Sequence, residues 1–175
     1  MTRHNHTHTA GVVIIVMGVS GSGKTTFGRQ FAEAINARFA EGDDYHPPNN
    51  VAKMSSGAPL TDEDRQAWLD AMAADIDIWL EQGERVVLSS SALKRTYRDT
   101  LMVPRPDVEL IYLRSDREPL RERLKERRGH FMPSELLDSQ FDALQEPSPD
   151  ECAIILDALA PLEENVERAR RVLDL

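Results

Sequence analysis

The sequence predicts an α/β fold of three layers, in which a parallel sheet of five strands lies between two layers of helices. Short apolar segments alternate along the chain with longer segments of helical periodicity, the pattern of folds built from parallel strands. The first apolar segment, Val12–Met17, contains no polar residue, as expected of a strand buried on both faces. A chain of 175 residues can also bury enough surface for one domain without a disulfide or a structural metal.

Local signals place the elements in chain order. The strands are short and mostly apolar, whereas the helices show apolar side chains at helical spacing, as at Trp68, Met72 and Ile76. Thr61 and the three acidic residues after it predict a helix start. Residues 42–60, rich in Pro, Gly, Asn and Ser, are expected to be irregular. The predicted strands are 12–17, 38–40, 85–89, 108–113 and 153–157, and the predicted helices are 24–37, 61–83, 116–128 and 161–173.

Composition argues against several classes of function. The chain has 30 acidic and 21 basic residues and a formal net charge of −9, which disfavours a surface made for nucleic acid or for an anionic membrane. Its longest apolar run, Val12–Met17, is far shorter than a membrane span, and the polar N-terminus does not resemble a signal peptide. Cys152 is the only cysteine, so no disulfide can form within the chain and a reducing cytoplasm is expected.

Residues 1–10 carry three of the five histidines, His4, His6 and His8. Alternating imidazoles can chelate a transition metal, which is one interpretation of this segment. No Cys, Asp or Glu lies among them to complete a site, so a disordered polar tail ahead of the first strand is the simpler interpretation. Residues 11–175 are then expected to form a single domain.

The strongest chemical signal is the segment Gly18-Val-Ser-Gly-Ser-Gly-Lys-Thr25, which matches the phosphate-binding pattern G-x-x-x-x-G-K-[ST] between a predicted strand and a predicted helix. Glycines let the backbone turn its N–H groups toward phosphate oxygens, and the helix N-terminus adds partial positive charge. Lys24 can reach the β- and γ-phosphates of a nucleoside triphosphate, and the Thr25 hydroxyl can ligate magnesium. The residues predicted to bind the nucleotide are Gly18, Val19, Ser20, Gly21, Ser22, Gly23, Lys24, Thr25 and Thr26.

A second candidate segment, Glu41-Gly-Asp-Asp-Tyr-His-Pro-Pro48, follows the short second strand. The carboxyl ends of parallel strands meet at one edge of a sheet, so this segment is expected to face the nucleotide. Its carboxylates could hold magnesium through water, or one of them could accept the proton of an acceptor hydroxyl. An acidic surface loop, with His46 as an ordinary turn residue, is the alternative.

Residues 114–128 combine seven basic with four acidic residues in an otherwise acidic chain. Glu118, Glu122 and Glu126 are spaced four residues apart, and Arg123 and Arg127 likewise, so one interpretation is a solvated helix with surface ion pairs, each contributing about 0.3–0.5 kcal/mol. The alternative is a lid that brings Arg123, Arg127 and Arg128 over the triphosphate, where they would neutralise charge and help to exclude water.

Together, these segments resemble the gluconokinases. The Gly-Asp-x-x-His-Pro and Ser-Ala-Leu-Lys segments are far more specific than the phosphate loop. The resemblance implies the P-loop kinase fold that shikimate and nucleoside monophosphate kinases share, with a small helical lid at about residues 121–145 and an acceptor-binding region at about residues 42–82. It covers nearly the whole chain after residue 10 and is carried by residues 18–26, 41–54, 57–69, 91–99, 111–113, 128–132 and 145–147.

The activity implied by this resemblance is ATP-dependent phosphorylation of D-gluconate to 6-phosphogluconate, by in-line transfer of the γ-phosphoryl group to the 6-hydroxyl with Mg²⁺. A cytoplasmic homodimer is also implied. The same resemblance assigns Lys24, Asp43 and Arg128 to catalysis and Arg123 and Arg127 to the nucleotide, and it favours the lid over a solvated helix.

Gluconate is a small polyol with one carboxylate, so its site needs a cation and several hydrogen-bonding groups. The candidate cations outside the phosphate loop are Lys53, Arg65, Lys94, Arg95 and Arg98, although most lysines and arginines are simply exposed to solvent. A hydroxyl at the end of the third predicted strand could bind sugar hydroxyls, and the resemblance adds two residues of the acidic segment. The predicted substrate-binding residues are Asp43, His46, Lys53, Arg65, Ser91 and Lys94.

Departures from the family pattern are modest. Gluconokinases often carry Cys where Ser90 sits and Arg where Met102 sits, and shikimate kinases carry Asp where Glu41 sits, which leaves open how this loop meets magnesium. A kinase for another small acceptor, such as shikimate or a nucleoside monophosphate, is an alternative that the Gly-Asp-x-x-His-Pro segment disfavours. A nucleotide-dependent switch is a further alternative, but the chain has no Asn-Lys-x-Asp guanine motif.

Overall fold

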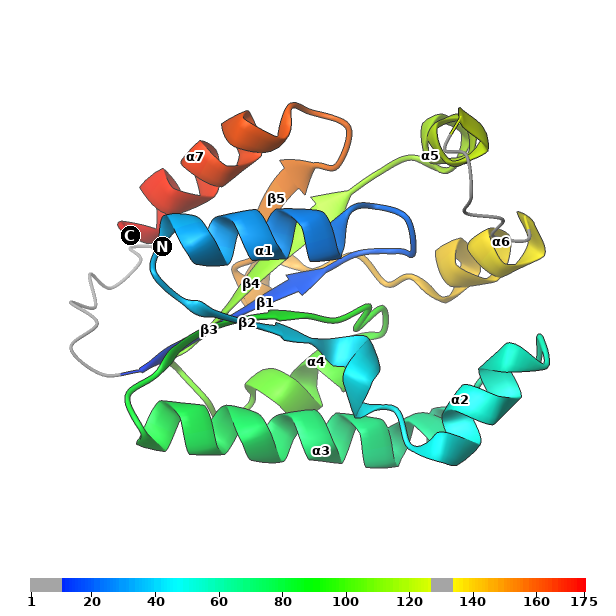
Figure 1. Ribbon diagram of the computed structural model, residues 1–175, viewed down its shortest axis with the longest axis horizontal. Helices are drawn as coiled ribbons and strands as arrows, with labels where there is room; N and C mark the ends of the chain where they lie inside the picture. Colours follow the sequence, from blue (N-terminus) through cyan, green and yellow to red (C-terminus); the bar gives the residue numbers. More distant parts are fainter. Residues whose placement is uncertain (1–10, 127–133) are drawn as a thin grey trace.

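The computed structural model describes residues 11–126 and 134–175, and it confirms the three-layer α/β fold with a sheet of five parallel strands (Figure 1). The strand order is β2-β3-β1-β4-β5, so the first strand lies at the centre of the sheet. The strands are β1 (Val12–Met17), β2 (Arg38–Glu41), β3 (Arg85–Ser89), β4 (Val108–Arg114) and β5 (Ile154–Asp157).

Helices cover both faces of the sheet, α1 and α7 on one side and α3 and α4 on the other (Figure 1). The helices α2, α5 and α6 lie beyond the carboxyl ends of the strands in the same view. The α-helices of the described residues are α1 (Lys24–Ala34), α2 (Pro48–Ser55), α3 (Asp62–Glu81), α4 (Arg95–Met102), α5 (Arg117–Glu126), α6 (Ser134–Ala143) and α7 (Leu162–Leu173), and two 3₁₀ turns are η1 (Gly42–Tyr45) and η2 (Pro149–Glu151).

Two hydrophobic cores lie on the two faces of the central strand. Successive side chains of a strand point to opposite faces of the sheet. Because helices cover both faces, all six residues of β1 are buried. The odd-numbered residues 13–17 belong to the core under α3 and α4, and the even-numbered residues 12–16 belong to the core under α1 and α7. This double burial explains why the sequence of β1 is an unbroken apolar run.

The structure corrects the prediction that residues 42–60 are irregular. They contain η1 and α2. Pro48 does not prevent α2, because it occupies the first helical turn, where the backbone N–H has no partner within the helix and the φ of proline is already helical. Helix α4 was not predicted either, and α6 was expected only as part of the helical lid at about residues 121–145, without bounds of its own. At eight and ten residues they are short, and the periodic signal in so few residues is weak.

The predicted helix start at Thr61 is confirmed as a capping box. Thr61 Oγ1 accepts a hydrogen bond from the Asp64 N–H (3.2 Å), and the Asp64 carboxylate accepts one from the Thr61 N–H (2.7 Å). The helix α3 that follows is the longest of the described residues, and none of the described helices has the length and apolar character needed to cross a membrane. The predicted tail at residues 1–10 lies outside the described residues.

The buried face of α3 gives a direct test of the packing. Ile76 is completely buried, so Ile76→Ala removes buried methyl groups and leaves a cavity, and we expect the free energy of unfolding to fall by about 2–5 kcal/mol. Ile78 lies on the same helix but is 45% exposed, so Ile78→Ala should change that free energy by no more than about 0.5 kcal/mol. Urea denaturation of both variants measures the difference, and equal losses would contradict the packing described for α3.

Candidate active site at the carboxyl ends of the strands

The glycine-rich loop connects the central strand β1 to helix α1, as the sequence predicts. Gly21 and Gly23 have φ angles of 80° and 93°, a backbone region that is unfavourable for residues with a side chain. Gly23 precedes the first turn of α1, and no side chain caps that helix end. The loop and the helix N-terminus therefore form a cradle for an anion at the centre of the sheet edge.

Lys24 lies across this loop. Its Nζ donates a hydrogen bond to the Val19 carbonyl (3.0 Å), so the ammonium group links the end of the loop to its beginning. Burial lowers the pKa of Lys24 to about 8, although the neighbouring carboxylates of Asp43 and Glu41 oppose the shift. The lysine is therefore close to carboxylates of the second candidate segment, as expected if the two segments form one site.

Glu41 joins the end of the second strand to the phosphate loop. Its carboxylate accepts hydrogen bonds from Thr25 Oγ1 (2.8 Å) and from the hydroxyl of Ser89. Glu41 and Ser89 are paired in register at the carboxyl ends of β2 and β3, which brings them to the same level. The Thr25 hydroxyl and the Glu41 carboxylate are oxygen donors of the kind that Mg²⁺ prefers, so these residues fit that ion.

Gly42 positions the acidic segment against the end of β3. A Cβ atom at this residue would lie only 2.2 Å from the Ser89 carbonyl oxygen, so only glycine allows the contact. The Gly42 carbonyl accepts a hydrogen bond from Trp68 Nε1 (2.7 Å), and this tryptophan is completely buried in α3. The backbone on the N-terminal side of Asp43 is thereby fixed from two sides, while the Asp43 side chain remains exposed.

His46 lies flat on Trp68, with ring centroids 4.7 Å apart and an angle of 9° between the planes. Burial lowers the pKa of His46 and the Arg65 guanidinium adds to this, whereas Asp43 opposes it. Among the described residues, the buried Nδ1 atom of His46 has no hydrogen-bond partner. Burial therefore favours the neutral form of the ring, and the stacking on Trp68 fixes its plane.

The predicted cations of the acceptor region differ in what they contact. Lys53 pairs with Asp64 (2.5 Å) and Lys94 pairs with Asp62 (2.7 Å), so the acidic first turn of α3 holds both lysines. The Arg65 guanidinium instead lies over the ring of Tyr97, 5.9 Å from its centroid, and has no carboxylate partner among the described residues. Ser91 is half-buried in the loop between β3 and α4 that also carries Lys94.

Arg98 and Arg95 were also considered as substrate cations, and the structure gives both another role. Arg98 is 1% exposed and forms an ion pair with Glu151, while its Nη1 donates to the Ala92 and Leu93 carbonyls (3.1 and 3.2 Å). It therefore anchors the loop between β3 and α4. Arg95 pairs with Asp99 and Asp150 (2.9 and 2.8 Å) and donates to the Ser148 hydroxyl, which ties α4 to the segment before β5.

Helix α5 lies beside the phosphate loop. Its Leu124 side chain comes within 2.7 Å of where a Cβ atom of Gly21 would lie, and Arg123 Nη1 donates to the Ala158 carbonyl (2.7 Å) after β5. Ion pairs of Arg117 and Arg121 with aspartates of α6 join the two helices. The predicted nucleotide contact Arg127 and the predicted catalytic residue Arg128 lie outside the described residues.

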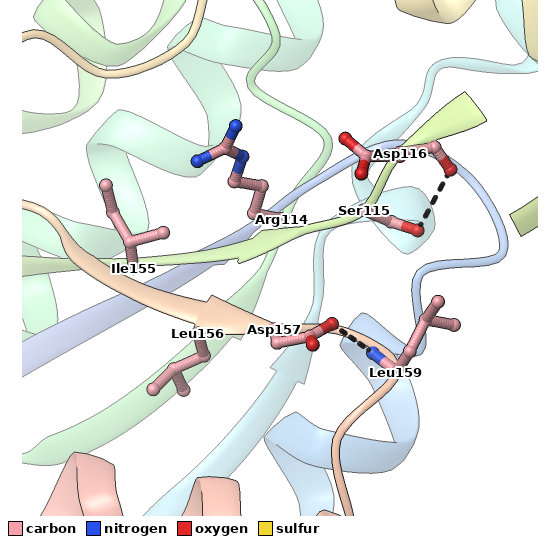
Figure 2. A pocket seen from close by; sticks show the side chains of 7 residues that line it. All are labelled: Arg114, Ser115, Asp116, Ile155, Leu156, Asp157 and Leu159. Carbon is pink, nitrogen blue, oxygen red and sulfur yellow. Dashed lines mark hydrogen bonds between the residues drawn. The ribbon is translucent and has the colours of Figure 1, made fainter. Parts of the chain in front are cut away.

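A pocket of about 350 Å³ opens between the carboxyl ends of β4 and β5 (Figure 2). In the strand order it lies on the opposite side of β1 from the acidic segment, which follows β2. Within it, Asp157 Oδ1 accepts a hydrogen bond from the Leu159 N–H (2.8 Å). The lining residues are Arg114, Ser115, Asp116, Ile155, Leu156, Asp157 and Leu159.

Several contributors to this site were not predicted. Trp68 was assigned to the core only, yet it supports both the Gly42 carbonyl and the ring of His46. Gln140 of α6 contacts the phosphate loop, since its Oε1 accepts from the Ser20 N–H (2.6 Å) and its Nε2 donates to Ser20 Oγ (2.9 Å). A tryptophan spaced for a core position and a glutamine outside any motif give no local signal of these roles.

A parallel sheet with a glycine-rich phosphate loop after its central strand is the arrangement of the P-loop nucleotide-binding proteins, to which the P-loop kinases belong. A family model described as an AAA domain matches residues 13–147. The thermoresistant gluconokinase of Escherichia coli is 41% identical over 165 residues, which cover 93% of this chain and 92% of that protein. The chain belongs to the gluconokinase family.

Solved structures agree with this assignment. A gluconokinase from Sinorhizobium meliloti superposes with a TM-score of 0.84 at 44% identity, covering 93% of this chain and 91% of that one. A shikimate kinase from Bacteroides thetaiotaomicron, at 20% identity, has a TM-score of 0.65 and covers 94% and 99% of the two chains. The second likeness concerns the fold alone, and it confirms the prediction that this fold is shared with shikimate kinases.

The lowered pKa of Lys24 predicts that affinity for a nucleoside triphosphate falls as the pH rises above about 8. Below that pH the ammonium is already charged, whereas above it binding must take up a proton, so Kd should rise by up to about tenfold per pH unit. Calorimetry with a non-hydrolysable ATP analogue measures this profile. In Lys24→Arg the charge persists at all these pH values, and the profile should be flat. A flat profile for the wild type would contradict the prediction.

Proposed function

We propose that this protein transfers the γ-phosphoryl group of ATP to the 6-hydroxyl of D-gluconate and forms 6-phospho-D-gluconate. The observation that carries the proposal is the convergence of Lys24, Asp43 and Glu41 at the carboxyl ends of β1 and β2, which places an acidic acceptor segment beside a phosphate-binding loop. The names of the relatives supply the identity of the acceptor.

The order of the strands suggests how the two substrates share the site. The phosphate loop follows β1 at the centre of the sheet, the acidic segment follows β2, and the pocket lies at β4 and β5. The triphosphate would occupy the centre, with gluconate on the side of Asp43 and the nucleoside toward the pocket. This arrangement would place the 6-hydroxyl in line with the γ-phosphate.

In the reaction, the Asp43 carboxylate accepts the proton of the 6-hydroxyl as its oxygen attacks the γ-phosphorus. The bond from the γ-phosphorus to the bridging oxygen breaks, and ADP leaves. Lys24 offsets the negative charge of the β- and γ-phosphates, aided by the N–H groups of the loop. The exposure of Asp43 and its influence on the pKa of Lys24 support this role.

Magnesium would be held by Thr25, with the Glu41 carboxylate close enough to bind it directly or through water. Mg²⁺ at such sites is usually held by one or two protein groups together with phosphate oxygens and water. When bound, the ion neutralises charge on the phosphates. Among residues 11–126 and 134–175, no cluster of three His, Cys, Asp or Glu offers another metal site.

Arg65 is the residue best placed to bind the gluconate carboxylate. It is half-buried beside His46, and its guanidinium has two parallel donors that match a carboxylate. We assign His46 to the hydroxyls of the sugar acid, and Ser91, Lys53 and Lys94 to the rim of this site. The two lysines would exchange their present carboxylate partners for the substrate.

We also propose that α5 and α6 act as the predicted lid at about residues 121–145. The contact of Leu124 with the phosphate loop and the bond from Arg123 to the segment after β5 support it. Arg123, Arg127 and Arg128 would then meet the nucleotide. The homodimer, the cytoplasmic location and the absence of nucleic-acid or membrane partners stay predictions.

A coupled assay of ADP release tests the proposed function. It contains ATP and Mg²⁺ and is run with and without D-gluconate. We expect gluconate to increase turnover strongly, with shikimate and a nucleoside monophosphate as negative controls. ADP release that gluconate does not increase would contradict the assigned acceptor and leave nucleotide binding in place. Stimulation by shikimate instead would support a kinase for another acceptor.

The role of Asp43 makes a separate prediction. Asp43→Asn should keep nucleotide affinity within about threefold while lowering gluconate-dependent kcat by about 10²–10⁴-fold, because the amide cannot accept the proton. Asp44 is the adjacent exposed carboxylate, and Asp44→Asn is the matched control, with kcat expected near the wild-type value. Undiminished turnover of Asp43→Asn would rule out the assigned role.

A further inference from the structure

We propose that Gln140 is a positioning residue of the nucleotide site, which holds the Val19–Ser20 part of the phosphate loop in the orientation that binds a triphosphate. This inference rests on the nucleotide-binding part of the proposed function but not on the identity of the acceptor. Gln140 belongs to α6 and lies 120 residues after Ser20 along the chain, and no motif contains it.

The contact between Gln140 and Ser20 uses both ends of the glutamine side chain. Its Oε1 accepts a hydrogen bond from the Ser20 N–H at 2.6 Å, and its Nε2 donates one to Ser20 Oγ at 2.9 Å. Two bonds to one residue fix orientation as well as distance, which a single bond does not. The carboxamide therefore sets the direction of the Val19–Ser20 peptide, which carries the Ser20 N–H, and of the Ser20 side chain.

Apolar packing brings α6 to the loop. Val19 is buried in a cluster with Leu93, Leu120 and Leu137, which come from the segment before α4, from α5 and from α6. Leu124 of α5 lies against Gly21 on the next part of the loop. This packing is not directional, so the orientation of the loop depends on its polar contacts, and Gln140 supplies the one that comes from α6.

The loop is held from its inner side as well. Lys24 Nζ donates to the Val19 carbonyl (3.0 Å), and the Ser22 N–H donates to the same carbonyl (3.2 Å). When a triphosphate attracts Lys24, the loop loses part of this inner support. The outer contact from Gln140 does not involve the lysine, so it can persist and keep the loop in place during binding.

A neutral amide suits this position better than a carboxylate. The neighbouring acidic residues of α6, Asp138 and Asp142, pair with arginines of α5. A glutamate at residue 140 could still accept from the Ser20 N–H, but it would place a negative charge beside the bound triphosphate. The chemistry of the glutamine thus fits a residue that must support an anion site without repelling the anion.

The test is the affinity for a non-hydrolysable ATP analogue, measured by calorimetry without any acceptor. Gln140→Ala removes both hydrogen bonds and should raise Kd about five- to tenfold. Gln140→Glu is nearly isosteric and should raise Kd at least as much, with the increase shrinking at high salt. Asp142→Asn removes an ion pair between α5 and α6 without touching the loop, and its Kd should match the wild type.

A double-mutant cycle with Ser20→Ala completes the test. If Gln140 acts through Ser20, the effects on Kd should be less than additive. Unchanged affinity of both Gln140 variants would overturn the proposal, and so would an equal loss in Asp142→Asn, which would indicate general docking of α6. Because no acceptor is present, failure of the gluconate assay leaves this outcome unaffected, so the two proposals fail separately.

Discussion

The close contact between Gly42 and the Ser89 carbonyl is the constraint on which the site depends. A side chain at residue 42 would collide with the end of β3, and the hydrogen bond from Trp68 holds the Gly42 carbonyl on its other side. With this glycine fixed, Glu41 is directed to Thr25 and Asp43 lies near Lys24. Two loops that are separate in sequence thereby become one site, and the buried core of α3 supports it through Trp68.

Charge is distributed to suit two anionic substrates in an acidic protein. The first turn of α3 carries three acidic residues, which interact favourably with the partial positive charge of the helix N-terminus. Two of them, Asp64 and Asp62, hold Lys53 and Lys94 in place. Arg65 lies on the same helix without such a partner among the described residues, so its charge is available at lower cost than that of the lysines. The net charge of −9 therefore describes the whole surface and not this site.

The sequence was sufficient for features that local chemistry determines. Burial on both faces makes β1 an apolar run, the phosphate loop needs its glycines, and a capping residue followed by acids marks the start of α3 at Thr61. Contacts between distant residues were not predictable. Arg98 was considered as a substrate cation because the carboxylate of gluconate needs one, yet Glu151, 53 residues away, pairs with it in the interior.

The same limit applies to the loop contacts of α6 and to the helices that sequence analysis missed. Eight residues in α4 give three apolar positions, Tyr97, Leu101 and Met102, and such a short pattern is also found in loops. What makes α4 a helix is tertiary: it packs on α3, and Arg95 and Arg98 attach it to the segment before β5. Propensity in so short a segment is weaker than these contacts, so only the structure could place it.

Groups of the phosphate site form hydrogen bonds with one another and with the loop backbone. Lys24 donates to the Val19 carbonyl and Thr25 donates to Glu41, so neither a buried ammonium nor a hydroxyl lacks a partner. Binding of a triphosphate exchanges these contacts for stronger charge-assisted ones instead of creating contacts from solvated groups. Because Gly42 and the end of β3 do not depend on that exchange, the backbone geometry is set before the ligand arrives. Such preorganisation lets the loop stabilise charge that develops during phosphoryl transfer without first reorganising.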